Sequence, residues 1–158
     1  MKYGYEKYYH KNGNIKHEKY CMNGKLHRED NRAEIFYYSD GNIEKETYYI
    51  HGTLHRDDGP AIIYYHQNGN IEYEAYYENG KLYREDNPAE NYYYSNGNKR
   101  CELYYENNKL HRLNGPAIID YYENGSIKLQ EYHINGEEYN ELEYFIKAGM
   151  IKGEKNEI

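Results

Sequence analysis

The sequence is poor in several residue types that usually build or brace a small protein. Its 158 residues include no tryptophan, two phenylalanines, three prolines and two cysteines. Two cysteines are too few for a disulfide framework, so reduced thiols and a cytoplasmic location are expected. Apolar runs span only a few residues, which excludes a transmembrane helix. The start, MKYGYEKYYHKNG, lacks the apolar core of a secretory signal.

Positive charge is also in short supply. There are 20 Lys and Arg residues against 27 Asp and Glu residues, and the formal net charge is -7. Binding to a nucleic-acid backbone needs clustered Lys and Arg, so no direct nucleic-acid binding is expected. The same acidic balance disfavours anionic lipid, so membrane contact is not the expected role.

Tyrosine, in contrast, is abundant, with 25 copies in the chain. Tyrosine has a strong strand preference and a polar tip that tolerates water. A chain this polar can therefore still bury area if tyrosine rings form its core. A disordered chain is excluded, because disordered sequences are poor in aromatic residues.

Glycines recur at a fixed interval of 28 residues. One column contains Gly13, Gly41, Gly69, Gly97 and Gly125. A second column contains Gly24, Gly52, Gly80, Asn108 and Gly136. Self-similarity at a fixed period of this length is typical of repeat proteins.

Each unit combines strand-like segments with turn sequences. In the unit around residue 70, strands are expected at 61–67 and 71–78, followed by a short segment at 81–84. Asn-Gly or Asp-Gly pairs, the strongest short-range hairpin signal, join these segments. Proline occurs only in the turn that restarts the unit, where a strand must stop. The pattern predicts an all-β fold built of tandem 28-residue repeats.

The end of the chain departs from this pattern. Asn140 is a suitable N-cap, and Glu143 stands at the third helical position. Three apolar residues then follow helical spacing: Leu142, Phe145 and Ile146. We expect a short helix at 141–148 that covers the last strands, because a bare sheet edge invites aggregation. The chain thus divides into a β-repeat domain of about five units at 1–140 and a helical cap and tail at 141–158.

Alternation along the strands separates a constant face from a variable face. On the constant face of the first long strand lie Ala61, Ile63 and Tyr65 and their counterparts in the other units. In the second long strand a glutamate column and a tyrosine column share the constant face: Glu18, Glu46, Glu74, Glu102 and Gln130, then Tyr20, Tyr48, Tyr76, Tyr104 and Tyr132. The residues between them vary freely: His17, Lys45, Tyr73, Cys101 and Leu129.

An arginine column follows the glutamate column by ten residues. Arginine forks bind phosphate and carboxylate groups, so the column could form a ligand-binding ladder. A structural Glu–Arg ion pair is favoured instead, because the last unit replaces Glu by Gln130 and Arg by Asn140 together. The predicted structural ladder pairs Glu18 with Arg28, Glu46 with Arg56, Glu74 with Arg84, and Glu102 with Arg112.

No active site is expected. His51 and His55 have metal-like spacing, but they flank a glycine turn, and a metal site needs three or four convergent ligands. No serine or cysteine nucleophile recurs beside a base. The repeated carboxylates are too regular to act as a catalytic pair with separated pKa values. We therefore expect no metal, no cofactor and no enzymatic activity.

The variable face is rich in tyrosine and has two compatible interpretations. A one-layer sheet must cover both sides, and tyrosine does so without precipitating. Tyrosine and arginine are also enriched at interface hot spots, which favours a partner-binding surface. A stacking platform for single-stranded nucleic acid would also use aromatic residues, but it needs a basic groove that this acidic chain lacks. The candidate partner-binding residues are Tyr64, His66, Tyr92, Tyr94 and Tyr122, with Glu90, Asp120 and Glu123 as an acidic rim.

Two segments carry a family resemblance: YYENGKLYR at 76–84 and YYENNKLHR at 104–112. With the hairpins between them, they resemble the MORN (membrane occupation and recognition nexus) family. The resemblance covers about residues 5–140 and is nearest to the MORN-variant repeats of bacterial antitoxin-like proteins. Arginine replaces the glycine that usually follows the histidine-type position, and the period is longer than usual. The resemblance implies an elongated, single-layer antiparallel β-meander and no activity of its own.

The resemblance leaves several roles open: scaffolding, partner binding, lipid contact and toxin neutralisation. The favoured expectation is a non-enzymatic protein-binding module, in its sharpest form an inhibitor or antitoxin-like neutraliser. A rigid acidic sheet could occlude the cleft of a basic partner such as a nuclease. The alternative is a structural scaffold or a contact with membrane lipid. The oligomeric state and the identity of the partner stay open.

Overall fold

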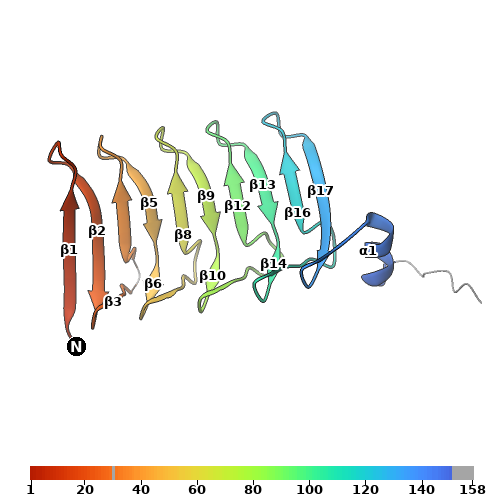
Figure 1. The fold of residues 1–158 in the computed structure, drawn as a ribbon, viewed down its shortest axis with the longest axis horizontal. Helices are drawn as coiled ribbons and strands as arrows, with labels where there is room; N and C mark the ends of the chain where they lie inside the picture. The colour runs from red at the N-terminus through yellow and green to blue at the C-terminus, as the bar shows by residue number, and fades with distance from the viewer. Residues whose placement is uncertain (30, 151–158) are drawn as a thin grey trace, which may run out of the picture.

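A single row of antiparallel strands makes up most of the molecule (Figure 1). The computed structural model describes residues 1–29 and 31–150. Within them a 12-stranded sheet has the order β1-β2-β4-β5-β8-β9-β12-β13-β16-β17-β18, and β3 pairs with β2. Every pair in it is antiparallel and its strands follow one another in chain order, with short two-stranded hairpins (β6-β7, β10-β11 and β14-β15) between units, so the predicted elongated single-layer meander is confirmed.

The strands follow the 28-residue period. The first unit contains β1 (Tyr3–Tyr9), β2 (Ile15–Met22) and β3 (Lys25–Leu26). The second contains β4 (Glu34–Tyr37), β5 (Ile43–Thr47), β6 (Tyr49–Ile50) and β7 (Thr53–Leu54). The third contains β8 (Ile62–Tyr65), β9 (Ile71–Ala75), β10 (Tyr77–Glu78) and β11 (Lys81–Leu82). The fourth contains β12 (Glu90–Tyr93), β13 (Lys99–Leu103), β14 (Tyr105–Glu106) and β15 (Lys109–Leu110). The fifth contains β16 (Ile118–Tyr121), β17 (Ile127–Ile134) and β18 (Glu137–Tyr139).

Both kinds of predicted hairpin turn are present. The Asn79-Gly80 turn places both residues in the left-handed region, with φ angles of 50° and 79°, as a two-residue hairpin of this type requires. The other turn, represented by Gly69 with φ 88°, precedes a β-bulge. The bulge makes Tyr64 oppose Tyr73 and Tyr65 oppose Ile71, so one residue on the second strand has no direct partner. The same register shift recurs in every unit.

The most deeply buried side chains of the sheet lie near the restart turn, and Ala75 on the variable face is one of them. Four alanines on the constant face are also fully buried there: Ala33, Ala61, Ala89 and Ala117. Their backbone groups extend the sheet ladder beyond the regular strands; the Ala61 N–H donates to the Ala75 carbonyl, and the Ala61 carbonyl accepts from Tyr48 N–H. Every unit therefore joins its neighbour through the same backbone bonds.

The C-terminal helix α1 (Glu141–Lys147) confirms the predicted cap helix. Asn140 and Glu143 form a capping box, in which each side chain accepts from the other residue's backbone N–H. The contact with the sheet differs from the prediction: Tyr144 is fully buried, whereas Leu142 and Ile146 are exposed. Residues 151–158, the expected tail, lie outside the described residues. No helix in the described part of the chain is long and apolar enough to cross a membrane.

Candidate functional site

Four glutamates on the constant face, all but Glu74 of them buried, are bound by tyrosines of the following unit. Each tyrosine hydroxyl donates to a glutamate 19 residues earlier: Tyr37 to Glu18 (2.7 Å), Tyr65 to Glu46 (3.0 Å), Tyr93 to Glu74 (2.9 Å) and Tyr121 to Glu102 (2.6 Å). These contacts satisfy carboxylates that would be costly to bury alone. Burial and the Glu18 carboxylate raise the pKa of Tyr37 to about 12.

The predicted Glu–Arg ladder is wrong. Each arginine instead lies over the ring of the tyrosine eight residues earlier. The distances from the guanidinium carbon to the ring centroid are 4.0 Å for Arg28 over Tyr20, 4.0 Å for Arg56 over Tyr48, 3.8 Å for Arg84 over Tyr76 and 3.7 Å for Arg112 over Tyr104. The two-residue hairpin folds the arginine back onto the ring, where the guanidinium gains a cation–π contact. Glutamate and arginine thus share a face, but each has other partners.

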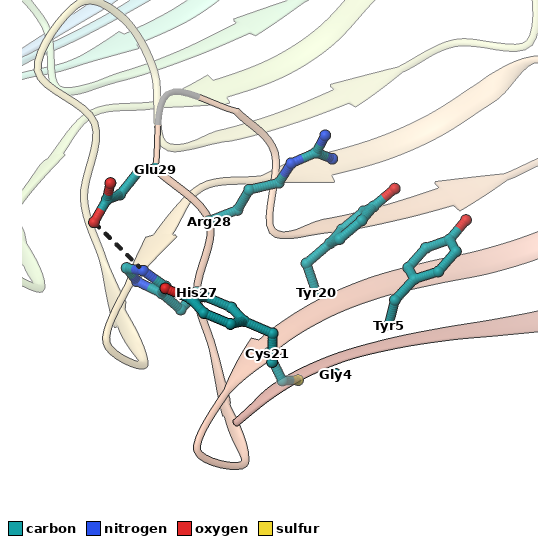
Figure 2. A pocket seen from close by; sticks show the side chains of 8 residues that line it. Gly4, Tyr5, Tyr20, Cys21, His27, Arg28 and Glu29 are labelled. Atoms are coloured by element: carbon teal, nitrogen blue, oxygen red, sulfur yellow. Dashed lines mark ion pairs between the residues drawn. The ribbon is translucent and has the colours of Figure 1, made fainter. Parts of the chain in front are cut away.

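The first unit shows this stack at the edge of a pocket (Figure 2). Arg28, Tyr20 and Tyr5 lie side by side, and the rings of Tyr5 and Tyr20 stack with centroids 4.5 Å apart. The pocket has a volume of about 290 Å³. His27 closes one side; its Nδ1 accepts from the backbone N–H of His51, 24 residues later. These side chains bind one unit to the next, which is a structural role.

The end of the repeat explains why the last unit lacks both glutamate and arginine. The Tyr144 ring of α1 packs at a tilt against Tyr132, with ring centroids 4.7 Å apart, on the ring that an arginine covers in the other units. The Tyr144 hydroxyl also accepts from Gly115 N–H and donates to the Arg112 carbonyl. In the other units the glutamate is bound by a tyrosine of the following unit. After the fifth unit α1 replaces a further repeat, so within the described residues no such tyrosine is present to bind a glutamate at position 130. The joint loss reflects capping, not a broken ion pair.

A continuous row of mostly aromatic side chains crosses the variable face. We call it the aromatic row: Tyr8, His17, Phe36, Lys45, Tyr64, Tyr73 and Tyr92, each directly opposite the next across neighbouring strands. The rings of His17 and Phe36 stack at 4.1 Å, and Tyr73 lies 5.8 Å from Tyr64 and 4.7 Å from Tyr92. The Lys45 ammonium lies 4.9 Å from the Tyr64 ring centroid. The row is a mostly half-buried surface of rings with one cation, Lys45, between Phe36 and Tyr64.

The aromatic candidates divide into two groups. Tyr64 and Tyr92 belong to the aromatic row. His66 Nε2 instead lies 3.1 Å from the Tyr93 carbonyl oxygen, and the Tyr94 hydroxyl donates to the Tyr121 carbonyl oxygen at 2.8 Å. His66 and Tyr94 therefore hold adjacent units together in addition to lining this side of the sheet.

The expected acidic rim is only partly available to a partner. The Tyr73 hydroxyl donates to Glu90, so this carboxylate is engaged; burial and Glu90 together raise the pKa of Tyr73. Glu123 accepts from the Asn96 side chain at 3.2 Å. Tyr122 is 52% exposed and is the most accessible of the candidate rings. Asp120 faces a pocket at the end of the sheet.

This pocket, which we call the Arg100 pocket, gathers three candidate residues. Tyr92, Tyr94 and Asp120 line it, and Arg100 and Lys128 add two cationic groups. Its volume is about 360 Å³. The remaining lining residues are Cys101, Leu103 and Tyr121. Burial and Asp120 raise the pKa of the Cys101 thiol to about 12, so the thiol is protonated near neutral pH and is a poor nucleophile.

The sequence interpretation missed several residues on this face. Tyr73, Phe36 and Lys45 complete the aromatic row, and they could have been found by following the freely varying column across the strands. Arg100 and Lys128 were missed because they stand at the bulge, where simple alternation assigns the wrong face.

Comparison with known families agrees with this architecture. The chain is a tandem β-repeat protein whose units differ mainly on one face. The family described as MORN repeat variant matches residues 33–51, 62–79 and 72–87. The matched segments are therefore MORN-variant repeats, and such repeats indicate a binding or scaffold module. No curated protein and no solved structure matches the chain.

Proposed function

We propose that this protein is a cytoplasmic, non-enzymatic module that binds another protein, a basic one, through its variable face and neutralises it as an antitoxin-like inhibitor does. One observation carries the proposal. The constant face repeats the same contacts in unit after unit, whereas the aromatic row changes from one unit to the next. Contacts that maintain the fold require repetition, but they do not require the variable face to be aromatic.

The chemistry of the row supports a protein partner. Half-buried rings supply contact area at a small cost in side-chain entropy, and a contiguous aromatic patch on a protein usually marks an interaction site. Glu44 and Glu72 lie near Tyr38 beside the middle of the row and raise the pKa of Tyr38, after burial as the larger cause. Together with the net charge of -7, they favour a basic partner by electrostatic steering.

The test uses residues that the chain already tolerates. The column of Tyr64 and Tyr92 carries Asp120 in the fifth unit, so the double variant Tyr64→Asp/Tyr92→Asp introduces a side chain that this column accepts. Full-length wild type and variant are used as baits in lysate of the native host. A protein captured by the wild type is then purified, and its affinity is measured by calorimetry.

The proposal expects a basic partner whose affinity falls at least tenfold in the variant while the thermal midpoint changes little. Tyr93→Phe, on the constant face, is the matched control and should retain the partner. Equal binding by Tyr64→Asp/Tyr92→Asp and the wild type would remove the variable face as the binding site. Capture of anionic vesicles in place of a protein would favour the lipid-contact role.

A further inference from the structure

The position that bulges in each unit carries a different charge along the sheet. The unpaired residue of each bulge is Lys16, Glu44, Glu72, Arg100 or Lys128, in order of the units. Arg100 reaches the variable face, since its guanidinium carbon lies 5.3 Å from the Tyr92 ring centroid. Consecutive bulges lie two inter-strand spacings apart, so these charges stand roughly 10 Å apart.

The charge row therefore changes sign between the third and fourth units. Glu44 and Glu72 occupy the middle of the sheet, and Arg100 and Lys128 occupy the end near α1. Both cations line one pocket of about 360 Å³ together with Tyr94. No ion pair joins either cation to a carboxylate within residues 1–29 and 31–150, although Asp120 lies in the same pocket.

We propose that the Arg100 pocket is a carboxylate subsite that receives an Asp or Glu side chain of the protein partner. This inference rests on the proposed function and refines it: the partner presents basic groups to Glu44 and Glu72 and an acidic group to Arg100 and Lys128. This pattern of negative and then positive charge fixes the register of the partner along the sheet. If the partner shifted by one unit, one of its charged groups would face a group of the same sign.

The pocket has the parts that the subsite needs. Arg100 and Lys128 supply the donors, and Arg100 can bind a carboxylate with two parallel N–H groups. The Tyr92 ring and Leu103 line the pocket and would contact the methylene groups of the incoming side chain. Asp120 lies in the same pocket and offsets one of the two cationic charges, which favours one carboxylate over a densely charged anion.

The test is a titration of the ¹⁵N-labelled full chain with a hexaglutamate peptide capped at both ends, followed by amide chemical shifts. Wild type should show shifts concentrated at Arg100, Cys101 and Lys128. The double variant Arg100→Glu/Lys128→Glu should bind at least tenfold more weakly. Its fold is expected to survive, because units two and three already carry glutamate at the same bulge position.

A gain-of-function variant provides the matched control. Glu44→Lys/Glu72→Lys places cations at bulges that accept lysine in the first and fifth units, and it should acquire a second set of shifted amides around these positions. Shifts scattered over all basic residues, or equal binding by wild type and Arg100→Glu/Lys128→Glu, would overturn the subsite. So would inorganic phosphate binding the pocket as tightly as the peptide, which would indicate a site for small anions.

The experiments distinguish a failure of the carboxylate subsite from a failure of the proposed function. A partner captured through Tyr64 and Tyr92 and bound unchanged by Arg100→Glu/Lys128→Glu would remove the subsite and leave the binding function. Hexaglutamate binding in the pocket without any captured protein would leave the subsite and count against the proposed partner.

Discussion

Replacement of Tyr65 by phenylalanine tests the contacts of the constant face most sharply. The Tyr65 hydroxyl donates to Glu46 at 3.0 Å, and Glu46 is only 6% exposed. Without the hydroxyl, this carboxylate keeps Arg32, whose Nη1 lies at 2.7 Å, but loses one of its two donors in the described structure. A hydrogen bond to a charged group contributes about 1.5–3 kcal/mol, so Tyr65→Phe should lower the free energy of unfolding by about 2 kcal/mol.

The assay is urea unfolding followed by far-ultraviolet circular dichroism. A double-mutant cycle with Glu46→Gln and Tyr65→Phe should give a coupling free energy of at least about 1 kcal/mol. The control cycle pairs Glu46→Gln with Arg56→Leu, and it should be additive within about 0.5 kcal/mol, because Arg56 lies over Tyr48 instead. Additivity in the first cycle and coupling in the second would refute the tyrosine–glutamate hydrogen bonds and restore the Glu–Arg ion pair.

Three further predictions concern the cap, alkaline pH and the turns. Tyr144→Ala should lower the free energy of unfolding by about 3–5 kcal/mol, because Tyr144 is fully buried. Leu142→Ala, at a side chain 62% exposed, should change it by less than about 0.5 kcal/mol in the same urea titration. The folded-state pKa of Tyr37 is raised to about 12, so the contribution of its hydroxyl to stability is complete below pH ~10 and is lost as the pH rises towards 12. Thermal midpoints measured from pH 9 to about 12 should therefore fall across that window. A flat profile would contradict the contact with Glu18. Gly69→Ala should destabilise by about 1 kcal/mol through backbone strain alone, since φ is +88° and no atom lies within 4 Å of the added Cβ. Gly80→Ala should cost more, because its added Cβ would lie 3.0 Å from a neighbouring methyl carbon; equal urea midpoints would contradict this difference.

The meander, the turns and the cap helix could be predicted from the sequence because residues close together in the chain determine each of them. Asn79-Gly80 adopts the left-handed angles that its hairpin needs, and Asn140 with Glu143 starts the helix through a capping box. Each of these signals acts over a few residues, so spacing along the chain identifies it. The 28-residue period then places all units in one row.

The contacts between units could not be obtained in the same way. Glu46 has a conspicuous neighbour in sequence, Arg56, but its partner Tyr65 comes 19 residues later from the next unit. Tyr65 and its counterparts were visible on the constant face of the first long strand, but their pairing with glutamate depends on strand register, which the bulges shift. The bulges also bring Arg100 and Lys128 to the variable face, so the charged end of the candidate site emerged only from the structure.

The central claim is that the face that repeats holds the sheet together and the face that varies binds the partner. Hydroxyl-radical footprinting by mass spectrometry of the full chain, alone and with a captured partner, measures this directly because it reports tyrosine accessibility residue by residue. The account predicts that Tyr64, Tyr92 and Tyr122 lose oxidation on binding while Tyr83 and Tyr132, which lie away from the aromatic row, keep theirs. Protection of Tyr83 and Tyr132 with unchanged oxidation of Tyr64 and Tyr92 would contradict it.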